Sequence, residues 1–293
     1  MAAYLAQHQH GKLRVRLGRT WREGNTHYFS EWNVSTTLVS DMAHAFKTSS
    51  NADMTATDTQ KNTVYFVAKQ CSQRCSPEEY GVALARHFVK TYPKVSKTMV
   101  SIEATPWTRV SVAGQAHSHG FTVGGTELRT VYAAVDEAGK VEVVSGFKGL
   151  KVLKTTQSGY EDFLKDKYTI LKDTKERIVA TSITASWRYS GSVAYDAAYE
   201  TTKSALSDAF FGPAQTGVYS PSVQYTLFQM AKEALKRTPQ LDSIFLNMPN
   251  IHFIPCNPVT SKFEDDVYVA TSEPSGNIEA TITRAQVQPH AKL

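Results

Sequence analysis

The stretch that decides the fold runs Ala56-Thr57-Asp58-Thr59-Gln60-Lys61-Asn62-Thr63-Val64-Tyr65. It places short side chains with hydroxyl, carboxylate or amide groups directly before an apolar run. Such side chains accept hydrogen bonds from the free N–H groups of a first helical turn, so we expect a helix to begin near Asp58 or Thr59. A helix start also presents partial positive charge and unpaired donors to an anion. The stretch predicts either a plain helix cap or a cap that also binds an anion.

A second helix is expected over residues 77–92, and strands are expected on either side of the helix pair. Ser76 is the predicted N-cap, Pro77 takes the first helical position, and Glu79 completes a capping box. Before the helices, residues 12–17 alternate basic and apolar side chains, and residues 27–39 form a longer strand pattern. Extended stretches follow at 98–112 and 121–135. The N-terminal half therefore predicts the order ββααββ.

The second half repeats this order of elements. Strand patterns cover residues 141–153 and 178–189, helix patterns cover 194–210 and 223–236, and strand patterns return at 244–253 and 267–283. The halves share little sequence, so the repeat lies in the order of elements. Long antiparallel strands can close their edges by forming a barrel, often through oligomers. We predict an α+β fold with domains at 8–138 and 139–285, joined by a turn at 137–141 and followed by a tail at 286–293.

Composition excludes several classes of protein. The chain has 293 residues, which is enough for two domains, and its 41% hydrophobic and 20% charged content is that of a globular protein. A net charge of +5 favours small anions near a cleft but is far from that of a nucleic-acid-binding protein. The sequence has no run of about 18 apolar residues, so we expect no membrane span. It also has no signal-peptide core near Met1.

The cysteines and paired histidines give no metal-site pattern. Three cysteines, Cys71, Cys75 and Cys256, favour free thiols in a reducing compartment. Cys71 and Cys75 could face each other on a helix, but a metal site needs more ligands nearby. His117 and His119 would share one strand face, again without a third ligand close in sequence. We expect a structural or outer-shell role for these histidines and no metal.

Basic residues supply the first candidates for a site. Lys12, Arg14 and Arg16 should share one strand face, because side chains alternate with period two. They form either a solvated basic face or a face from which one of the cations points into a pocket. A lysine that is desolvated in such a pocket can act as a base. Arg177 is either half of a surface ion pair or a planar fork that binds an anionic, carbonyl-rich ring through two parallel hydrogen bonds.

Amides and an imidazole supply the remaining candidates. Gln224 stands in the first turn of a helix behind Ser220-Pro221-Ser222, where it is either solvated or presents its amide to the edge of a heterocycle. Pro249 interrupts an extended stretch and predicts an edge or a bend. Asn250 and His252 follow it on one face of the strand. They are either structural or converge on one functional spot.

Four groups of residues carry a family resemblance. They are Thr57-Asp58-Thr59 with Lys61-Asn62-Thr63-Val64-Tyr65, Pro106-Trp107 followed by His117-Ser118-His119, Ser220-Pro221-Ser222-Val223-Gln224, and Asn247-Met248-Pro249-Asn250-Ile251-His252. In this order, and spread over nearly the whole chain, they resemble the urate oxidases (uricases). No single piece is decisive, but all of them in register are highly specific.

The resemblance implies a fold, an activity and a location. The fold is two tandem tunnelling-fold domains, assembled as a homotetramer around a tunnel with active sites at subunit interfaces. The activity is the oxidation of urate by O2 and water to 5-hydroxyisourate and hydrogen peroxide, with no metal or organic cofactor. The end Ala291-Lys292-Leu293 is similar to the Ser-Lys-Leu address, which implies a peroxisomal import receptor and a peroxisomal location.

Three alternatives stay open beside this activity. The first is a protein of the same fold that acts on or binds another purine or a pterin, because one fold hosts several chemistries. The second is a metal-dependent hydrolase that uses the histidines. The third is a non-enzymatic descendant of a uricase, and the presence of the expected site residues argues against it.

The resemblance also assigns roles at the substrate. It implies that Arg177 binds one edge of urate and that Gln224 binds the opposite edge. It implies further hydrogen bonds from the backbone of Val223 and of Asp58, together with Thr57. The aromatic ring that stacks on urate is a phenylalanine in the family.

The resemblance further assigns residues to ring stacking, oxygen binding and proton transfer. The stacking position falls here on Tyr160, and Phe163 is the alternative; a tyrosine can still stack its ring on a purine. The resemblance implies that Asn250 holds O2 or water above the ring. Lys12, Thr57 and His252 match the residues of a proton relay.

Overall fold

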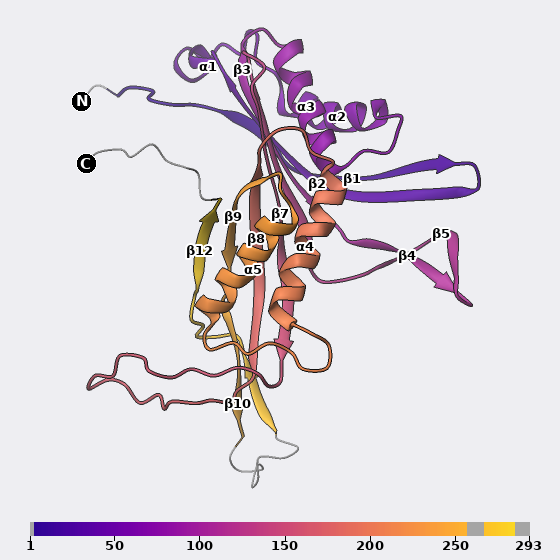
Figure 1. The fold of residues 1–293 in the computed structure, drawn as a ribbon. Coiled ribbons are helices and arrows are strands. Elements are labelled where there is room, and N and C mark those ends of the chain that lie inside the picture. The colour runs from indigo at the N-terminus through magenta and orange to yellow at the C-terminus, as the bar shows by residue number, and fades with distance from the viewer. Residues whose placement is uncertain (1–2, 257–266, 285–293) are drawn as a thin grey trace. The chain divides into compact units, whose positions relative to one another are not determined.

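The computed structural model describes residues 3–256 and 267–284. The chain divides into two compact units, residues 1–146 and 147–293. The division falls inside β7 (Val141–Lys154), which carries the chain from one unit into the other (Figure 1). The limits expected from the sequence, 8–138 and 139–285, stay predictions. The tail at 286–293 lies outside the described residues.

The first unit contains two long strands, helices, and further strands. Its elements are β1 (His10–Glu23), β2 (Thr26–Ser40), α1 (Ala43–Lys47), α2 (Thr57–Gln70), α3 (Pro77–Thr91), β3 (Val95–Ala104), β4 (Trp107–Val112), β5 (Gln115–Val123) and β6 (Leu128–Asp136). Strands β1, β2, β3 and β6 pair in that order, all antiparallel. β4 and β5 form a separate antiparallel hairpin. The expected strand at 98–112 therefore ends early, at the Thr105-Pro106 break before β4.

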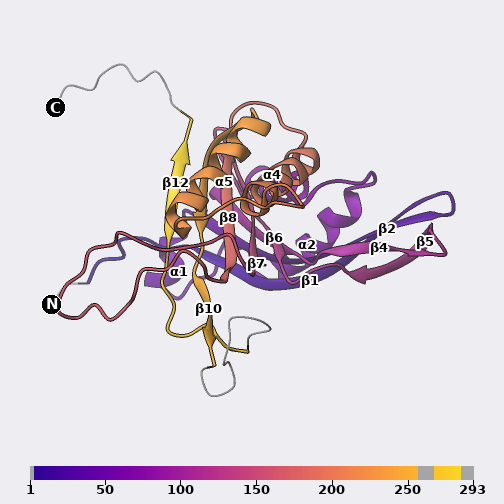
Figure 2. The ribbon, with the colours of Figure 1, turned by 60° about the horizontal axis from the view of Figure 1, so that its bottom comes forward.

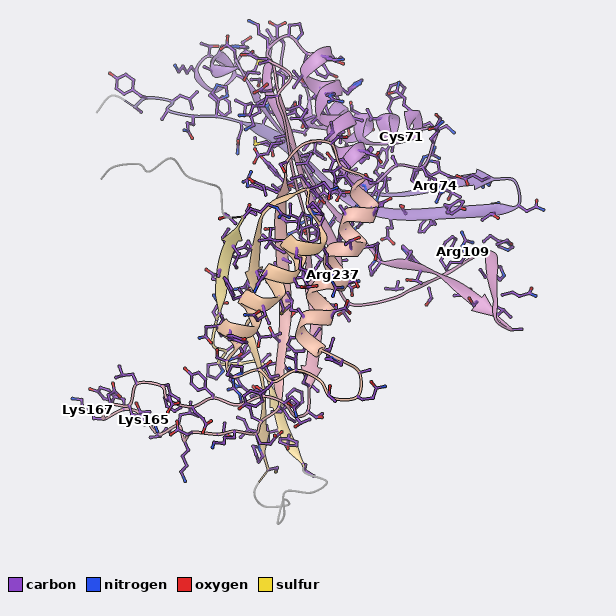
Figure 3. The ribbon with its side chains drawn as sticks, in the orientation of Figure 1. Cys71, Arg74, Arg109, Lys165, Lys167 and Arg237 are labelled. Atoms are coloured by element: carbon purple, nitrogen blue, oxygen red, sulfur yellow. The ribbon has the colours of Figure 1, made fainter. Side chains whose placement is uncertain are left out.

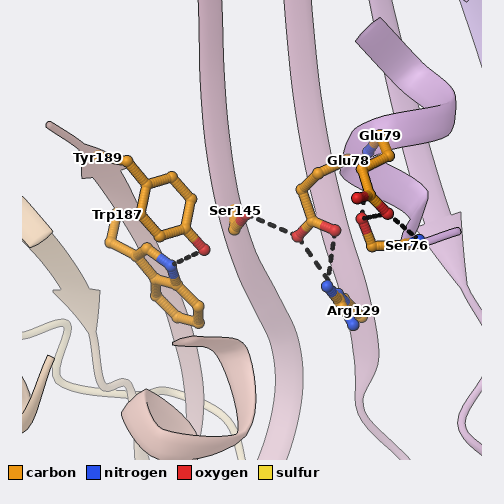
Figure 4. Close-up of polar contacts among 7 residues, drawn as sticks. All are labelled: Ser76, Glu78, Glu79, Arg129, Ser145, Trp187 and Tyr189. Atoms are coloured by element: carbon orange, nitrogen blue, oxygen red, sulfur yellow. Dashed lines mark hydrogen bonds and ion pairs between the residues drawn. The ribbon is translucent and has the colours of Figure 1, made fainter. Parts of the chain in front are cut away.

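Helix α3 begins as the sequence predicts. The Ser76 hydroxyl accepts a hydrogen bond from the Glu79 N–H at 3.1 Å, and the Glu79 carboxylate accepts one from the Ser76 N–H at 2.7 Å (Figure 4). This reciprocal pair satisfies two donors that a helix start would otherwise leave open. The helix then packs Tyr80 against Trp32 of β2, with ring centroids 4.7 Å apart.

A buried carboxylate ties α3 to the strands of its unit. Glu78 is fully buried, and its oxygens accept hydrogen bonds from Arg129 of β6 and Ser145 of β7, each at 2.6 Å (Figure 4). A buried charge is tolerated only when paired and hydrogen-bonded, and both conditions are met here. Helix α3 is thereby held at one place on the sheet.

The second unit repeats the order. Its elements after β7 are β8 (Val179–Tyr189), α4 (Tyr195–Phe211), α5 (Val223–Arg237), β9 (Leu241–Asn247), β10 (Asn250–Pro255), β11 (Tyr268–Thr271) and β12 (Glu279–Thr283). β9 lies between β8 and β12, while β10 pairs with the start of β8 and with β11, all antiparallel. The expected strand at 244–253 is split, because Met248-Pro249 separates β9 from β10. The expected strand at 267–283 is likewise split into β11 and β12.

Helices α4 and α5 lie side by side over the strands of the second unit, in Figure 1 and again in the turned view of Figure 2. Side chains of β8 alternate, so that Ile183, Ala185 and Trp187 enter the same core cluster as residues of both helices. The Trp187 indole N–H donates to the Tyr189 hydroxyl at 2.7 Å (Figure 4). No helix in the described part of the chain is long and apolar enough to span a membrane.

The α+β class and the doubled arrangement of two strands, two helices and further strands are confirmed. The hairpin β4–β5 and the short helix α1 are additions that the sequence patterns did not predict. Closure of the sheets into a barrel around a tunnel requires other copies of the chain and stays a prediction.

Candidate active site

A β-bulge decides where Lys12 points. Lys12 pairs with Thr36, but Val15 pairs with Val34, so three steps along β1 match two steps along β2. Arg14, inside the bulge, has φ of 58°. One extra residue in a strand reverses the alternation of side chains on either side of it.

The bulge turns Lys12 away from its basic neighbours. Residues directly opposite one another in an antiparallel pair share a face, so Lys12 shares the face of Thr36 and Val34, both fully buried. That face carries α2, because Val34 and residues of α2 belong to one core cluster. Arg14 and Arg16 are exposed. The prediction that Lys12, Arg14 and Arg16 share one face is wrong, and the bulge is the reason.

Helix α2 begins at Thr57 without a side-chain cap. The N-cap position is Ala56, so the capping by a short polar side chain that the sequence predicted is wrong. The Asp58 carboxylate instead accepts hydrogen bonds from Lys61 Nζ at 2.5 Å and Asn62 Nδ2 at 3.0 Å. Lys61 lowers the pKa of Asp58, with a smaller contribution from the charge of Lys12. Lys12 therefore lies within electrostatic reach of the start of α2.

A buried hydroxyl and amide connect Lys12 to α2. The backbone N–H of Lys12 donates a hydrogen bond to Thr36 Oγ1 at 3.4 Å, and the Thr36 hydroxyl donates one to Gln60 Oε1 at 2.9 Å. Thr36 and Gln60 are fully buried, and Gln60 Nε2 has no partner among the described residues. Gly11 permits the close approach of the strands here, since a Cβ on it would lie 2.0 Å from the Thr36 carbonyl oxygen. No sequence pattern marks Thr36 or Gln60, because their pairing depends on the bulge.

In the second unit, Arg177 is partly desolvated, and hydrogen bonds to Ser158 hold it in position. Its N–H donates to the Ser158 carbonyl at 2.9 Å, and its Nε donates to Ser158 Oγ at 3.4 Å. Burial lowers the pKa of Arg177, while Tyr160 and Tyr219 act in the opposite direction. An arginine keeps its charge under such a shift. No carboxylate of the described residues pairs with it, so the guanidinium is available to an anion.

Tyr160 lies against this arginine. The Arg177 guanidinium carbon lies 5.3 Å from the Tyr160 ring centroid, and Phe163 stacks on the same ring at 4.9 Å and 7°. Gly159, just before Tyr160, has no room for a side chain, since a Cβ would lie 2.1 Å from the Tyr219 hydroxyl. Of the two aromatic candidates, Tyr160 is the one whose ring the guanidinium contacts.

A buried lysine joins the Arg177 region to the start of α5. The Gly159 N–H donates to the Ser220 carbonyl at 3.0 Å, which places the two segments side by side. Lys154 donates to Ser220 Oγ at 2.9 Å and to the Val218 carbonyl at 2.7 Å. Lys154 is only 9% exposed, and burial lowers its pKa. Its role was missed from the sequence, where it is one lysine in an alternating strand.

Helix α5 presents Gln224 at its open end. Ser222 is the N-cap, and its hydroxyl accepts a hydrogen bond from the Tyr225 N–H at 3.1 Å. Val223 is buried against the second core, and Gln224 is exposed. The buried valine and the cap fix the first turn, so the Gln224 amide stands in a defined place open to a ligand.

The side chains of Asn250 and His252 share one face of β10. Asn250 pairs with Thr181 of β8, and its N–H donates to the Gly276 carbonyl at 2.9 Å. His252 pairs with Thr271 of β11. Thr181 is fully buried, and its hydroxyl has no partner among the described residues. Cross-strand pairing puts this hydroxyl on the same face as the Asn250 amide.

The expected site residues thus fall into two groups. Lys12, Thr57 and Asp58 belong to the first unit; Tyr160, Arg177, Val223, Gln224, Asn250 and His252 belong to the second. Lys12 and the start of α2 come together within the first unit. Arg177, Tyr160 and the segment leading to α5 come together within the second.

The paired histidines lie apart from both groups along the chain. His117 and His119 stand on β5 with ring centroids 4.5 Å apart, and His117 Nδ1 accepts a hydrogen bond from the His119 N–H at 3.2 Å. Among the described residues, no three histidine, cysteine or acidic side chains gather as metal ligands would. The contacts that the structure gives these histidines are to each other and to their own hairpin neighbours, together with His27.

Comparison with known proteins decides the family. The family model described as Uricase matches residues 8–134 and 143–279, which includes every expected site residue. The chain belongs to the uricase family. Among its curated relatives, the uricase of Arabidopsis thaliana is 48% identical over 94% of each chain. The uricase of Danio rerio is 37% identical over 97% of this chain and 95% of its own.

Solved structures of uricases have the same fold. The crystal structure of uricase from Arthrobacter globiformis has a TM-score of 0.88 and 32% sequence identity, covering 99% of this chain and 98% of that one. A urate oxidase from Bacillus sp. TB-90 is only 20% identical, yet reaches a TM-score of 0.79 over 94% of this chain and shows the fold alone. The resemblance found in the sequence is confirmed at the level of family and fold.

Proposed function

We propose that the protein is a urate oxidase, an oxidoreductase that uses O2 as electron acceptor. The observation that carries the proposal is Arg177, a partly desolvated guanidinium without a carboxylate partner among the described residues. Its Nε donates a hydrogen bond to Ser158, its guanidinium carbon lies over the Tyr160 ring, and the segment around Ser158 is hydrogen-bonded to the one that leads to Gln224. Urate is flat, anionic and rich in carbonyl and N–H groups, so it suits such a cation and an amide on opposite edges.

Substrate orientation is the first task of these residues. Arg177 and Gln224 bind the two edges of urate, while the Tyr160 ring stacks on its face. The backbone of Val223 and of Asp58, with Thr57, adds hydrogen bonds. Fixing a planar ring in one orientation removes much of the entropic barrier to reaction.

Proton transfer is the second task. Removing a further proton from urate makes the ring electron-rich enough to reduce O2. Lys12, which the bulge turns toward α2, receives this proton through Thr57, and His252 completes the path. Asn250 holds O2, and later water, above the ring. Electron transfer gives a peroxide adduct, and water replaces peroxide to yield 5-hydroxyisourate and hydrogen peroxide, with no metal or organic cofactor.

We infer a homotetramer with active sites at subunit interfaces. The family's relay residues are divided between the two units, and the loop between β7 and β8 exposes large apolar side chains. Leu164 is 91% exposed and Ile170 is 94% exposed. The same loop carries Lys165 and Lys167, which are labelled in Figure 3. Apolar side chains gathered on one exposed loop indicate a surface that another chain covers.

A peroxisomal location belongs to the same proposal. Ala291-Lys292-Leu293 is similar to a peroxisomal address, and an import receptor would read it. The segment lies outside the described residues. Replacing Leu293 by aspartate in a fluorescent fusion should leave the protein diffuse, and unchanged punctate import would reject the signal.

One assay tests the activity. The chelator-treated protein is mixed with urate in air, and the loss of urate absorbance is followed together with the appearance of peroxide. We expect turnover with one peroxide per urate. Arg177→Gln should raise KM strongly, whereas Arg86→Gln, an exposed arginine on α3, should not. No turnover of urate would reject the proposal, and faster turnover of a pterin or another purine would favour the alternative substrate.

A further inference from the structure

A histidine joins the start of β1 to the segment that leads into α2. The Nε2 atom of His10 lies 2.9 Å from the carbonyl oxygen of Thr55. A carbonyl oxygen can only accept a hydrogen bond, so this ring nitrogen carries a proton and donates it. His10 is the first residue of β1, and Thr55 stands two residues before Thr57. The bond therefore connects a strand end to a helix start that lies far away in the sequence.

Strand register directs the imidazole toward α2. His10 pairs with Leu38 and Lys12 pairs with Thr36, and both partners on β2 are fully buried. Residues directly opposite one another share a face, and His10 and Lys12 both precede the bulge, so they project from the same face of β1. Leu38 belongs to the core cluster that contains residues of α2. His10 and Lys12 therefore lie together on the side of the sheet that α2 covers.

Helix α2 depends on such a bond because no side chain caps its start. Its N-cap residue is Ala56, which has no side chain that could accept a hydrogen bond. Helices α3 and α5, in contrast, are capped by the hydroxyls of Ser76 and Ser222. A helix without a capping side chain leaves its first N–H groups without that partner and its first turn less stable. Contacts with the strands therefore decide where Thr57 lies.

These contacts lie on both sides of the helix start. Before it, the carbonyl of the buried Thr55 accepts a hydrogen bond from His10; within the first turns, the buried Gln60 accepts one from Thr36. The two donors also flank Lys12, because His10 is two residues away along β1 and Thr36 is directly opposite on β2. The same pair of hydrogen bonds thus fixes the helix start relative to the lysine.

The far end of α2 is held by other residues. Arg19 Nη2 and Trp21 Nε1 of β1 donate to the Cys71 carbonyl at 2.9 Å and 3.1 Å. Helix α2 ends one residue before Cys71, and α3 begins two residues after Cys75, so the interpretation that these cysteines face each other on a helix is wrong. Because this end has its own bonds, loss of the His10 bond should release only the first turn of α2.

We propose that His10 is a positioning residue for the proton relay. Through the Thr55 backbone it holds the start of α2 at the distance from β1 at which Thr57 and Lys12 exchange a proton. His10 itself passes no proton. The inference rests on the proposed function, which gives Thr57 and Lys12 their roles. A displacement of about 1 Å at reacting groups can cost about 100-fold in rate, so one such bond is enough to affect turnover.

Two substitutions of His10 test this role. His10→Phe keeps a ring of similar size and removes the donor, whereas His10→Gln places an amide N–H at a similar reach. We expect kcat of His10→Phe to fall about tenfold or more with little change in KM, because the residues that bind urate, Arg177 and Gln224, are untouched. His10→Gln should restore most of kcat. Glutamine does not titrate, so this rescue separates positioning from acid–base catalysis.

His44 supplies a matched control. Its Nε2 lies 2.9 Å from the Ala52 carbonyl, in the segment between α1 and α2. His44→Phe removes the same kind of hydrogen bond from the same connecting segment, but this bond does not involve β1. We expect kcat near the wild-type value. A fall as deep as that of His10→Phe would overturn the specific role of His10.

Hydrogen exchange gives a readout that needs no urate. The first backbone bond of α2 runs from the Gln60 N–H to the Ala56 carbonyl at 3.1 Å. Amides of this first turn should exchange several-fold faster in His10→Phe and at the wild-type rate in His10→Gln, while the C-terminal half of α2 stays unchanged in both.

The outcomes separate this inference from the proposed function. Absence of urate turnover by the wild-type protein rejects the proposed function, and with it the relay, whatever the exchange rates are. Turnover by the wild type together with full activity of His10→Phe overturns the role of His10 alone. His10→Gln as slow as His10→Phe, or unchanged exchange in His10→Phe, would overturn it as well.

Discussion

At the residue scale, one inserted position in β1 separates the site lysine from its neighbours. Without the bulge, Lys12 would join Arg14 and Arg16 on a solvated face, as strand alternation predicts. With it, Lys12 lies opposite the buried Thr36, whose hydroxyl is bonded to Gln60 of α2. The Thr36 hydroxyl thus accepts a hydrogen bond from the backbone of Lys12 in β1 and donates one to Gln60 in α2. Its loss should disturb catalysis more than substrate binding.

Thr36→Val tests this connection. The change keeps the shape but leaves the buried Gln60 amide oxygen without its donor, which costs about 1–3 kcal/mol of stability. We expect kcat to fall about tenfold or more with little change in KM, because Lys12 loses its orientation while the residues that bind urate are untouched. Thr36→Ser retains the hydroxyl and should restore most of kcat. Steady-state kinetics and urea denaturation measure both; an equal rise in KM for the two variants would contradict the assignment.

Removal of relay groups gives a second residue-scale prediction. Lys12→Met and Thr57→Ala should each reduce kcat far more than they weaken urate binding, since both act on the proton rather than on the ring. Stopped-flow kinetics and urate titration under nitrogen separate the two effects. Loss of binding alone, with turnover of bound urate intact, would remove these residues from the relay.

At the element scale, Lys154 ties the loop before α5 to the end of β7. It is a buried cation that donates to a carbonyl and a hydroxyl, and no carboxylate in the described part of the chain pairs with it. Burial of this kind is unfavourable for the charged form, so the pKa of Lys154 is lowered. The segment so held leads through Ser220 to Gln224, and its backbone also bonds Gly159 beside Tyr160.

Lys154→Met should loosen this segment. We expect KM for urate to rise several-fold with a smaller fall in kcat, because both substrate edges are defined by elements that the lysine holds together. Lys151→Met, on the exposed face of the same strand, should change neither. Isothermal titration with a non-reacting urate analogue checks the binding part, and unchanged affinity in Lys154→Met would contradict the role.

The same residue predicts a pH dependence of stability. Because the folded-state pKa of Lys154 lies below its ordinary value of 10.5, the unfolded chain binds this proton more tightly. Its contribution to the free energy of unfolding should therefore rise with pH, from the lowered folded-state pKa up to about 10.5. Comparing urea denaturation of wild type and Lys154→Met across pH 8 to about 10.5 isolates it. A difference that is flat or falls with pH would contradict this direction.

At the scale of the whole molecule, the residues assigned to one reaction belong to two compact units. Lys12 and Thr57 come from the first, and Arg177, Gln224 and His252 from the second. The loop between β7 and β8 adds exposed apolar side chains that a lone chain would leave in water. Assembly of several copies would account for both features.

Ile170→Glu should therefore weaken assembly. A charge placed on a surface that another copy covers opposes association, so we expect a smaller particle and a parallel loss of turnover. Lys172→Glu, a charge change on an exposed neighbour in the same loop, should leave the tetramer largely intact. Light scattering coupled to gel filtration measures the size. Full activity in a dissociated Ile170→Glu monomer would contradict a site built between subunits.

The sequence by itself determined the order of elements, the capping box of α3 and the family. These depend on local patterns: side-chain period, short cap motifs, and segments such as 220–224 whose residues are neighbours along the chain. The tertiary structure alone decided the direction of Lys12, the start of α2 at Ala56-Thr57, and the roles of Lys154 and Gln60. The reason is physical. Strand register and burial arise from pairing between distant segments, and a one-residue bulge reverses every side chain beyond it without altering the local pattern.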